Sequence, residues 1–135
     1  METIELEHTV DAPIQDVRAA MLELEPFMRA SGFDEVDIDG DRLDISKALG
    51  LLRISLTLDR IEDPDADLAF EQVDGVFEAM TTTYSLTDRD GKTDVTAVTE
   101  FALDAPGGEI LDATLVKRQR RREIEAQFDY LDEAT

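Results

Sequence analysis

The chain has 135 residues, and its 33 Asp and Glu against 13 Lys and Arg give a formal net charge of -20 at pH 7. Such an acidic surface disfavours nucleic acids and anionic membranes as partners. The absence of cysteine excludes disulfides, thiol nucleophiles and cysteine-ligated metals.

The acidic residues are spread along the chain between intact apolar patterns. We therefore interpret them as the surface of a globular protein adapted to very high salt, in which salt screens their mutual repulsion. The N-terminus has no apolar signal core, and no apolar run is long enough for a transmembrane helix. We expect a single cytoplasmic domain over residues 1–135, without an integral membrane segment.

The first three elements are predicted to be a strand and two short helices. Ile4, Leu6, His8 and Val10 alternate with polar residues, which is typical of a half-buried strand. Pro13 marks the start of a helix with apolar residues at helical spacing, and a second helix follows and ends near Gly32.

From residue 33 to residue 103 the apolar period changes to two, which predicts six strands. Glycines following aspartates, at Gly40, Gly75 and Gly91, indicate tight turns between them. Short turns of this kind favour an antiparallel meander. Residues 109–133 then predict one long helix, which needs to lie on the sheet to be stable.

This order of elements resembles the helix-grip fold of the START-like, or SRPBCC, superfamily, which includes polyketide cyclases and dehydratases. The resemblance is carried by the opening strand running into Val10-Asp11-Ala12-Pro13, by the paired strands of residues 79–86 and 93–103, and by the terminal helix. The Lys-poor, acidic composition is similar to that of haloarchaeal members. The resemblance implies an α+β fold: a curved antiparallel sheet of about seven strands gripping the C-terminal helix, with a ligand cavity between them.

Five polar residues share the inward phase of the predicted strands and become candidates for the lining of that cavity. His8 is in phase with Ile4, Glu78 with Met80, Thr82 and Tyr84 continue the same strand, and Thr99 lies on its partner. His8 titrates near neutral pH, and a buried carboxylate at Glu78 would need a partner or a raised pKa. The alternatives are a packed His8, a Glu78 exposed at the cavity mouth and a Tyr84 that is simply a core aromatic.

Five of the 13 basic residues fall within six positions of the terminal helix: Lys117, Arg118, Arg120, Arg121 and Arg122. An apolar stripe formed by Ile110, Ala113, Ile124, Phe128 and Leu131 places Lys117 and Arg121 near its centre, with Arg120 at its edge. We therefore expect these three to be candidates for binding a ligand carboxylate or phosphate, and Arg118 and Arg122 to face solvent. The alternative is that all five pair with surface acids.

Common catalytic and metal-binding patterns are absent from the sequence. It has a single histidine, no Gly-x-Ser-x-Gly motif and no Gly-rich phosphate loop, so we expect no cofactor and no metal. Asp37 to Asp41 resemble part of a calcium loop, but they lack its closing glutamate and are better interpreted as a hairpin turn.

The leading hypothesis is a non-catalytic carrier or sensor of a small hydrophobic or amphipathic molecule, such as a lipid. A second hypothesis is an enzyme of the polyketide cyclase type that uses His8, Glu78 or Tyr84 as acid or base. A third is a module that binds a protein partner, similar to relatives that activate chaperones, for which an exposed apolar patch would be the sign.

Overall fold

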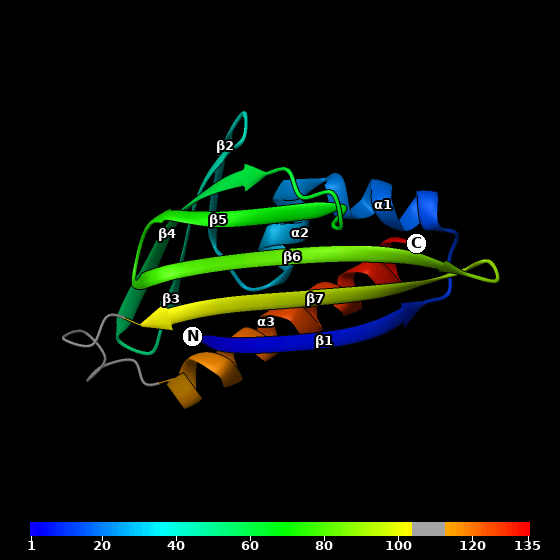
Figure 1. Ribbon diagram of the computed structural model, residues 1–135. Helices are drawn as coiled ribbons and strands as arrows, with labels where there is room; N and C mark the ends of the chain where they lie inside the picture. The colour runs from blue at the N-terminus through cyan, green and yellow to red at the C-terminus, as the bar shows by residue number, and fades with distance from the viewer. Residues whose placement is uncertain (104–112) are drawn as a thin grey trace.

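The computed structural model describes residues 1–103 and 113–135. Within these two ranges, three helices and seven strands follow one another in the predicted order (Figure 1). The elements are β1 (Glu2–Val10), α1 (Ile14–Leu22), α2 (Leu24–Ala30), β2 (Glu35–Asp39), β3 (Arg42–Leu49), β4 (Leu52–Ile61), β5 (Leu68–Asp74), β6 (Phe77–Arg89), β7 (Lys92–Leu103) and α3 (Ala113–Ala134). The first residues expected in the long helix, 109–112, lie outside the described residues.

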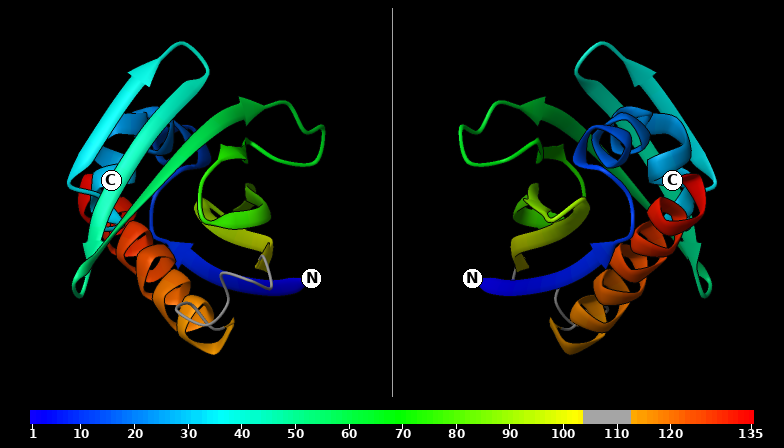
Figure 2. Two further views of the ribbon diagram at one scale, coloured as in Figure 1. Left: turned by 90° about the vertical axis from the view of Figure 1, so that its left-hand side faces the viewer. Right: turned by 90° about the vertical axis from the view of Figure 1, so that its right-hand side faces the viewer.

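The seven strands form one antiparallel sheet in the order β1-β7-β6-β5-β4-β3-β2. Strands β2 to β7 are a meander, and β1 returns to pair with β7 along its whole length, from Glu2 opposite Phe101 to Val10 opposite Thr93. The sheet curves around the helices, as both views in Figure 2 show. The helix-grip fold expected from the sequence is confirmed.

Tight turns join the strands where the sequence predicted them. Strands β6 and β7 are connected by Asp90 and Gly91, which have φ values of 52° and 86°. Two consecutive residues with positive φ match the twist of a two-residue hairpin, and Asp-Gly is a pair that tolerates this conformation. The meander therefore follows directly from local turn chemistry.

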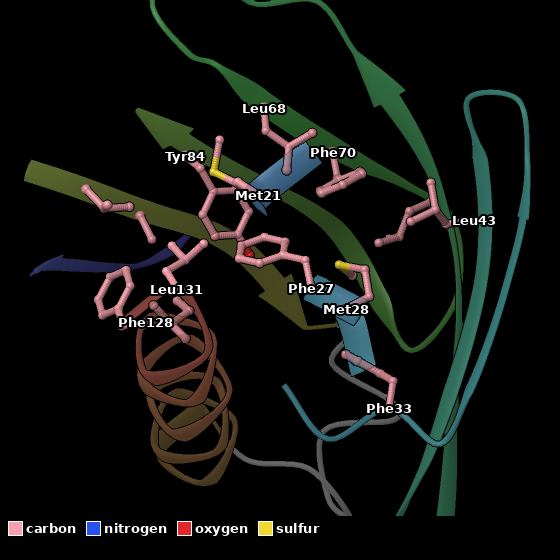
Figure 3. Packing of buried hydrophobic residues seen from close by; sticks show 14 of the residues in the cluster. Met21, Phe27, Met28, Phe33, Leu43, Leu68, Phe70, Tyr84, Phe128 and Leu131 are labelled. Carbon is pink, nitrogen blue, oxygen red and sulfur yellow. The ribbon is translucent and has the colours of Figure 1, made fainter. Parts of the chain in front are cut away.

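The core lies between the concave face of the sheet and the three helices. The inward residues of β6 and β7 alternate as predicted, and Tyr84 and Phe101 are almost fully buried. Phe27 of α2 packs edge-on against the ring of Tyr84, with 5.2 Å between ring centroids (Figure 3). Phe128 and Leu131 extend the cluster along α3.

A β-bulge near the start of β6 corrects the position expected for Glu78. Phe77 pairs with Leu103, whereas Ala79 pairs with the adjacent Ala102, so the strand holds one extra residue. An extra residue reverses the alternation of side chains. Phe77 and Met80 therefore both line the inner face, and Glu78 is exposed.

Gly75 lies in the turn before this bulge and has no room for a side chain. A Cβ there would lie 2.6 Å from Cδ2 of Leu56, and the backbone φ of +157° is rare for other residues. We expect Gly75→Ala to lower the free energy of unfolding by about 2–3 kcal/mol, because buried atoms would have to move. Chemical denaturation measures this change.

Gly40→Ala is the matched control for that substitution. Gly40 also has a positive φ, of +62°, but a Cβ added there would meet no atom within 4 Å. Only the backbone cost of about 1 kcal/mol should appear there. Equal losses for the two variants would contradict the steric explanation at Gly75.

Candidate functional site

A cavity of about 350 Å³ lies between the concave face of the sheet and the first half of α3. Most of its lining is apolar and comes from β3, β4, β5 and β6; it includes Ile45, Ile54, Leu56, Leu58, Phe70 and Met80. Leu52 and Leu115 also line it, although they are 41% and 48% exposed. The cavity therefore opens to the surface beside the β3–β4 turn and the start of α3.

Arg120 is the central polar group of this cavity. Its side chain is only 12% exposed, and its guanidinium donates to four neighbours. The Nε–H donates to Oγ1 of Thr99 at 3.1 Å, and Nη2 donates to Oγ1 of Thr82 and to the hydroxyl of Tyr84, both at 3.3 Å. Nη1 donates to Oε1 of Glu123 at 3.0 Å. The planar guanidinium is thereby fixed between strands β6 and β7 and its own helix.

Further hydrogen bonds hold the partners of Arg120 in place. The hydroxyls of Thr82 and Thr99 lie 3.0 Å apart on paired strands. Tyr84 donates its hydroxyl hydrogen to Oε1 of Gln127 at 2.7 Å, and Gln127 in turn donates to the carbonyl of Phe27 at 3.4 Å. Each of these polar side chains other than Arg120 is nearly completely buried. A network in which each buried polar side chain has at least one partner has one preferred geometry.

Lys47 and Glu123 complete the network on the side of β3. Nζ of Lys47 donates to Oε2 of Glu123 at 2.7 Å, and the two side chains are 9% and 10% exposed. The same ammonium lies 5.1 Å from the centre of the Phe33 ring, a favourable position for a cation. Glu123 is thus shared by two cations, one on each of its carboxylate oxygens.

Arg120 stays protonated in this setting. Burial by itself would lower the pKa of the guanidinium, but the interactions with Tyr84 and Glu123 outweigh that effect and leave the pKa raised. A buried and permanently charged donor is available at the cavity wall.

Four of the eight residues expected at the site lie together. Thr82, Tyr84, Thr99 and Arg120 are bonded to one another, and all but Thr99 line the cavity directly. The other four lie elsewhere: Glu78 is exposed by the bulge, and His8, Lys117 and Arg121 are outside the lining.

His8 lies on the flank of the molecule formed by β1 and the end of α3. Its Nε2 is 2.8 Å from a carboxylate oxygen of Asp132, and its ring stacks on Phe128 with centroids 5.1 Å apart. His8 therefore ties the first strand to the last turns of the chain, which agrees with the packing alternative for this residue.

The helical phase of the basic cluster differs from the prediction. Lys117 pairs with Glu2 of β1 at 2.7 Å and Arg121 is exposed, whereas Arg118 and Arg122 line the cavity. The long helix has β1 on one flank and the cavity on the other, so Arg118 and Arg122 are exposed as expected, but at the cavity mouth.

Three members of the network were missed from the sequence: Lys47, Glu123 and Gln127. Lys47 is in phase with the buried Leu43 and Ile45 on β3, and such a phase was a usable signal. Glu123 and Gln127 lie three and seven positions after Arg120, on the same side of the helix. Polar residues at this spacing along a core-facing stripe indicate a buried network.

The described part of the chain shows neither a metal-binding cluster nor a helix suited to cross a membrane. Within residues 1–103 and 113–135, no group of three or more His, Cys, Asp or Glu side chains could hold a metal ion. Among the helices described, none combines the length and the apolar content needed to cross a membrane.

Comparisons with known proteins support the fold. No family model matches the sequence, and no curated protein sequence matches it. Among solved structures, an aromatase/cyclase from Streptomyces sp. R1128 superposes with a TM-score of 0.78 at 15% identity, over 98% of this chain and 94% of the other. A START superfamily protein from Mycobacterium smegmatis gives 0.76 at 10% identity, over 97% and 94%.

A third similar structure is norcoclaurine synthase from Thalictrum flavum in complex with dopamine and hydroxybenzaldehyde. Its TM-score is 0.69 at 14% identity, over 98% of this chain and 87% of that one. Structures similar to this chain are thus START-like proteins, and at these identities the similarity establishes the fold alone.

Proposed function

We propose that this protein binds a small hydrophobic or amphipathic molecule in the cavity between the sheet and α3, as a carrier or sensor. The observation that carries the proposal is the cavity itself, about 350 Å³ in volume and lined mainly by apolar side chains. Ligand sites are usually apolar pockets of roughly 300–1,000 Å³ with a few placed polar groups. The network around Arg120 supplies such polar groups on one wall.

The side chains that reach the cavity give little support to the enzyme hypothesis. Two of the similar structures are enzymes by name, an aromatase/cyclase and a norcoclaurine synthase. The acid–base groups considered for such chemistry do not converge here, because His8 pairs with Asp132 and Glu78 is exposed. Tyr84 alone reaches the cavity. This arrangement favours binding without acid–base chemistry as the proposed role.

Exposed apolar side chains give less support to a protein-partner module. In the described part of the chain, the large apolar residues that are exposed are Met1, Leu51, Leu52, Val73 and Leu115. Leu52 and Leu115 belong to the cavity lining. A rim of apolar residues around a ligand entrance accounts for Leu52 and Leu115 without a separate docking patch.

The remaining parts of the proposal follow from composition. We propose that residues 1–135 form one START-like domain located in the cytoplasm of a cell with high internal salt. We also propose that the protein has no nucleic acid partner, because its net charge of -20 would repel one. The direct test is to incubate the protein with a total lipid extract in multimolar KCl, repurify it, and identify retained molecules by mass spectrometry. Failure to retain any small molecule would count against the proposal.

Filling the cavity should weaken ligand binding. Ile54 lines the cavity on β4, and we expect Ile54→Trp to weaken binding at least tenfold, since about 1–3 kcal/mol is the usual cost of forcing extra volume into a packed site. The readout is the ligand-induced rise in melting temperature, which disappears when binding is lost.

Val73→Trp is the matched control. Val73 is 51% exposed on β5 and does not line the cavity. This variant should retain ligand as the unchanged protein does. Equal retention by Ile54→Trp would mean that the molecule binds somewhere other than this cavity.

A further inference from the structure

The charge of the cavity lining is opposite to that of the whole chain. Among the residues that the structure describes, four basic side chains, Lys47, Arg118, Arg120 and Arg122, line the cavity together with one acidic side chain, Glu123. The chain as a whole has a formal net charge of -20. A concave site whose charge opposes its surroundings attracts and concentrates ligands of the opposite sign.

The excess of positive over negative side chains is also present in the buried part of the site. Lys47 and Arg120 share one carboxylate, that of Glu123, and neither forms a salt bridge with any other residue in the described part of the chain. One positive charge in this largely desolvated cluster is therefore not neutralised. Buried charges are costly unless they are paired, so a ligand anion would be stabilised here.

Hydrogen-bond counting indicates where such an anion would bind. A guanidinium has five N–H groups, and four hydrogen bonds to described side chains account for four of those of Arg120. The ammonium of Lys47 has three, and it donates to Glu123 and, at 3.4 Å, to the carbonyl of Ser31. Within the described residues, each cation keeps one hydrogen for a further acceptor.

The cavity mouth is also positively charged. Arg118 and Arg122 line it, and neither forms a salt bridge with a residue that the structure describes. Charges at the rim of a site raise the rate at which an oppositely charged molecule enters.

We propose that the ligand is an amphipathic monoanion, with an apolar body against β4 and β5 and a carboxylate bound by Lys47 and Arg120. This inference rests on the proposed function and specifies the class of molecule. A carboxylate matches the one uncompensated positive charge and accepts hydrogen bonds from both cations. The aliphatic wall, including Ile54 and Leu58, accommodates the apolar body.

Three ligands that differ only in their head group test the inference: decanoate, decan-1-ol and decylamine, titrated into the wild-type protein by calorimetry. We expect decanoate to bind at least about tenfold more tightly than decan-1-ol, because a hydrogen bond to a charged group contributes about 1.5–3 kcal/mol, and a factor of ten corresponds to about 1.4 kcal/mol. Decylamine should bind most weakly.

The outcomes separate the two proposals. Equal affinities for decanoate and decan-1-ol, or tighter binding of decylamine, would overturn the anion inference and leave the binding function intact. No binding of any of the three, together with no molecule retained from the lipid extract, would overturn the binding function itself.

Lys47→Met provides an independent test with a matched control. It removes one cation and leaves Glu123 paired with Arg120. We expect decanoate affinity to fall about tenfold and decan-1-ol affinity to stay unchanged. Lys117→Met makes the same change at a lysine that pairs with Glu2 outside the cavity, and it should alter neither affinity. A similar decanoate loss in both lysine variants would overturn the assignment of Lys47.

A second pair of variants covers the case in which Lys47→Met does not fold. Arg122 lines the cavity and its neighbour Arg121 does not, although both are exposed. At the lowest salt in which the protein stays folded, Arg122→Gln should slow the association of decanoate and Arg121→Gln should not, and the difference should shrink as salt screens the charge. Identical association rates in the two variants would overturn the role assigned to the mouth.

Discussion

Glu123→Leu is expected to lower the free energy of unfolding by about 3–5 kcal/mol, which is the usual effect of removing one partner from a buried ion pair. The side chain of Glu123 is 10% exposed and accepts hydrogen bonds from Lys47 at 2.7 Å and from Arg120 at 3.0 Å. Leucine would leave two cations facing each other across the site with no anion between them. Denaturant unfolding, followed by circular dichroism, measures the loss.

Two further variants show whether the loss arises from the two cations. Glu125→Leu changes an exposed glutamate on the same helix and should shift stability by less than about 0.5 kcal/mol. The double variant Lys47→Met with Glu123→Leu removes one of the unpaired cations, and it should be more stable than Glu123→Leu alone by about 1–2 kcal/mol. If the two losses simply added, the ion-pair explanation would be wrong.

The same glutamate explains why a buried cluster of charges is tolerated in a chain of this size. Lys47 and Arg120 approach each other because one carboxylate lies between them, and the hydroxyls of Thr82, Thr99 and Tyr84 accept three further hydrogen bonds from Arg120. Replacing such a network by apolar residues would often be neutral or stabilising in free energy. Stability by itself therefore does not explain the network, whereas the proposed anionic ligand would make use of its positive charge.

Local rules were sufficient to predict the order of the elements and the antiparallel meander, whereas the helix-grip arrangement was predicted from the resemblance to the START-like superfamily. Alternation placed Ile4, Val10, Tyr84 and Phe101 on the inner face, and glycine turns placed the strand ends. Alternation and turn preference depend only on residues that are neighbours in the sequence. They can therefore be recognised without knowing how distant parts of the chain pack. They do not show that β1 pairs with β7 or that the sheet curves around α3, which are contacts between distant parts of the chain.

The site was predicted less completely because it depends on long-range geometry. The bulge after Phe77 reversed the alternation of side chains at the start of β6. The sequence around Glu78 contains no residue from which this bulge could be predicted. The orientation of α3 was inferred from its apolar residues, including Ile110, which lies outside the described residues. The helix contacts β1 on one side and the cavity on the other, so a stripe drawn from apolar residues alone placed Lys117 and Arg121 in the cavity instead of Arg118 and Arg122.

Contacts between residues far apart in the sequence could not be predicted either. Lys47 and Glu123 are 76 positions apart in the chain, and their ion pair exists only because β3 and α3 face the same cavity. Tyr84 and Gln127 are 43 positions apart. A polar residue in an inward phase can be found in the sequence, whereas the identity of its partner requires the three-dimensional arrangement.

Arg120→Met is expected to weaken decanoate binding by about a hundredfold while affecting decan-1-ol by less than about threefold. Arg120 supplies the central buried charge, and loss of a charged hydrogen bond at the upper end of the usual range, about 3 kcal/mol, corresponds to that factor. Methionine retains much of the apolar stem, so the cavity keeps its shape. Calorimetric titration of both ligands into the variant gives the two affinities.

The stability of this variant should change little compared with its affinity. Without the guanidinium, Glu123 still accepts from Lys47, Tyr84 still donates to Gln127, and the hydroxyls of Thr82 and Thr99 still bond each other. Few buried polar groups are therefore left without a partner, and we expect unfolding to shift by no more than about 2 kcal/mol. Arg121→Met, at an exposed arginine next in the chain, should change neither quantity. Parallel losses of decanoate and decan-1-ol in Arg120→Met would mean that Arg120 maintains the shape of the cavity and does not select an anion.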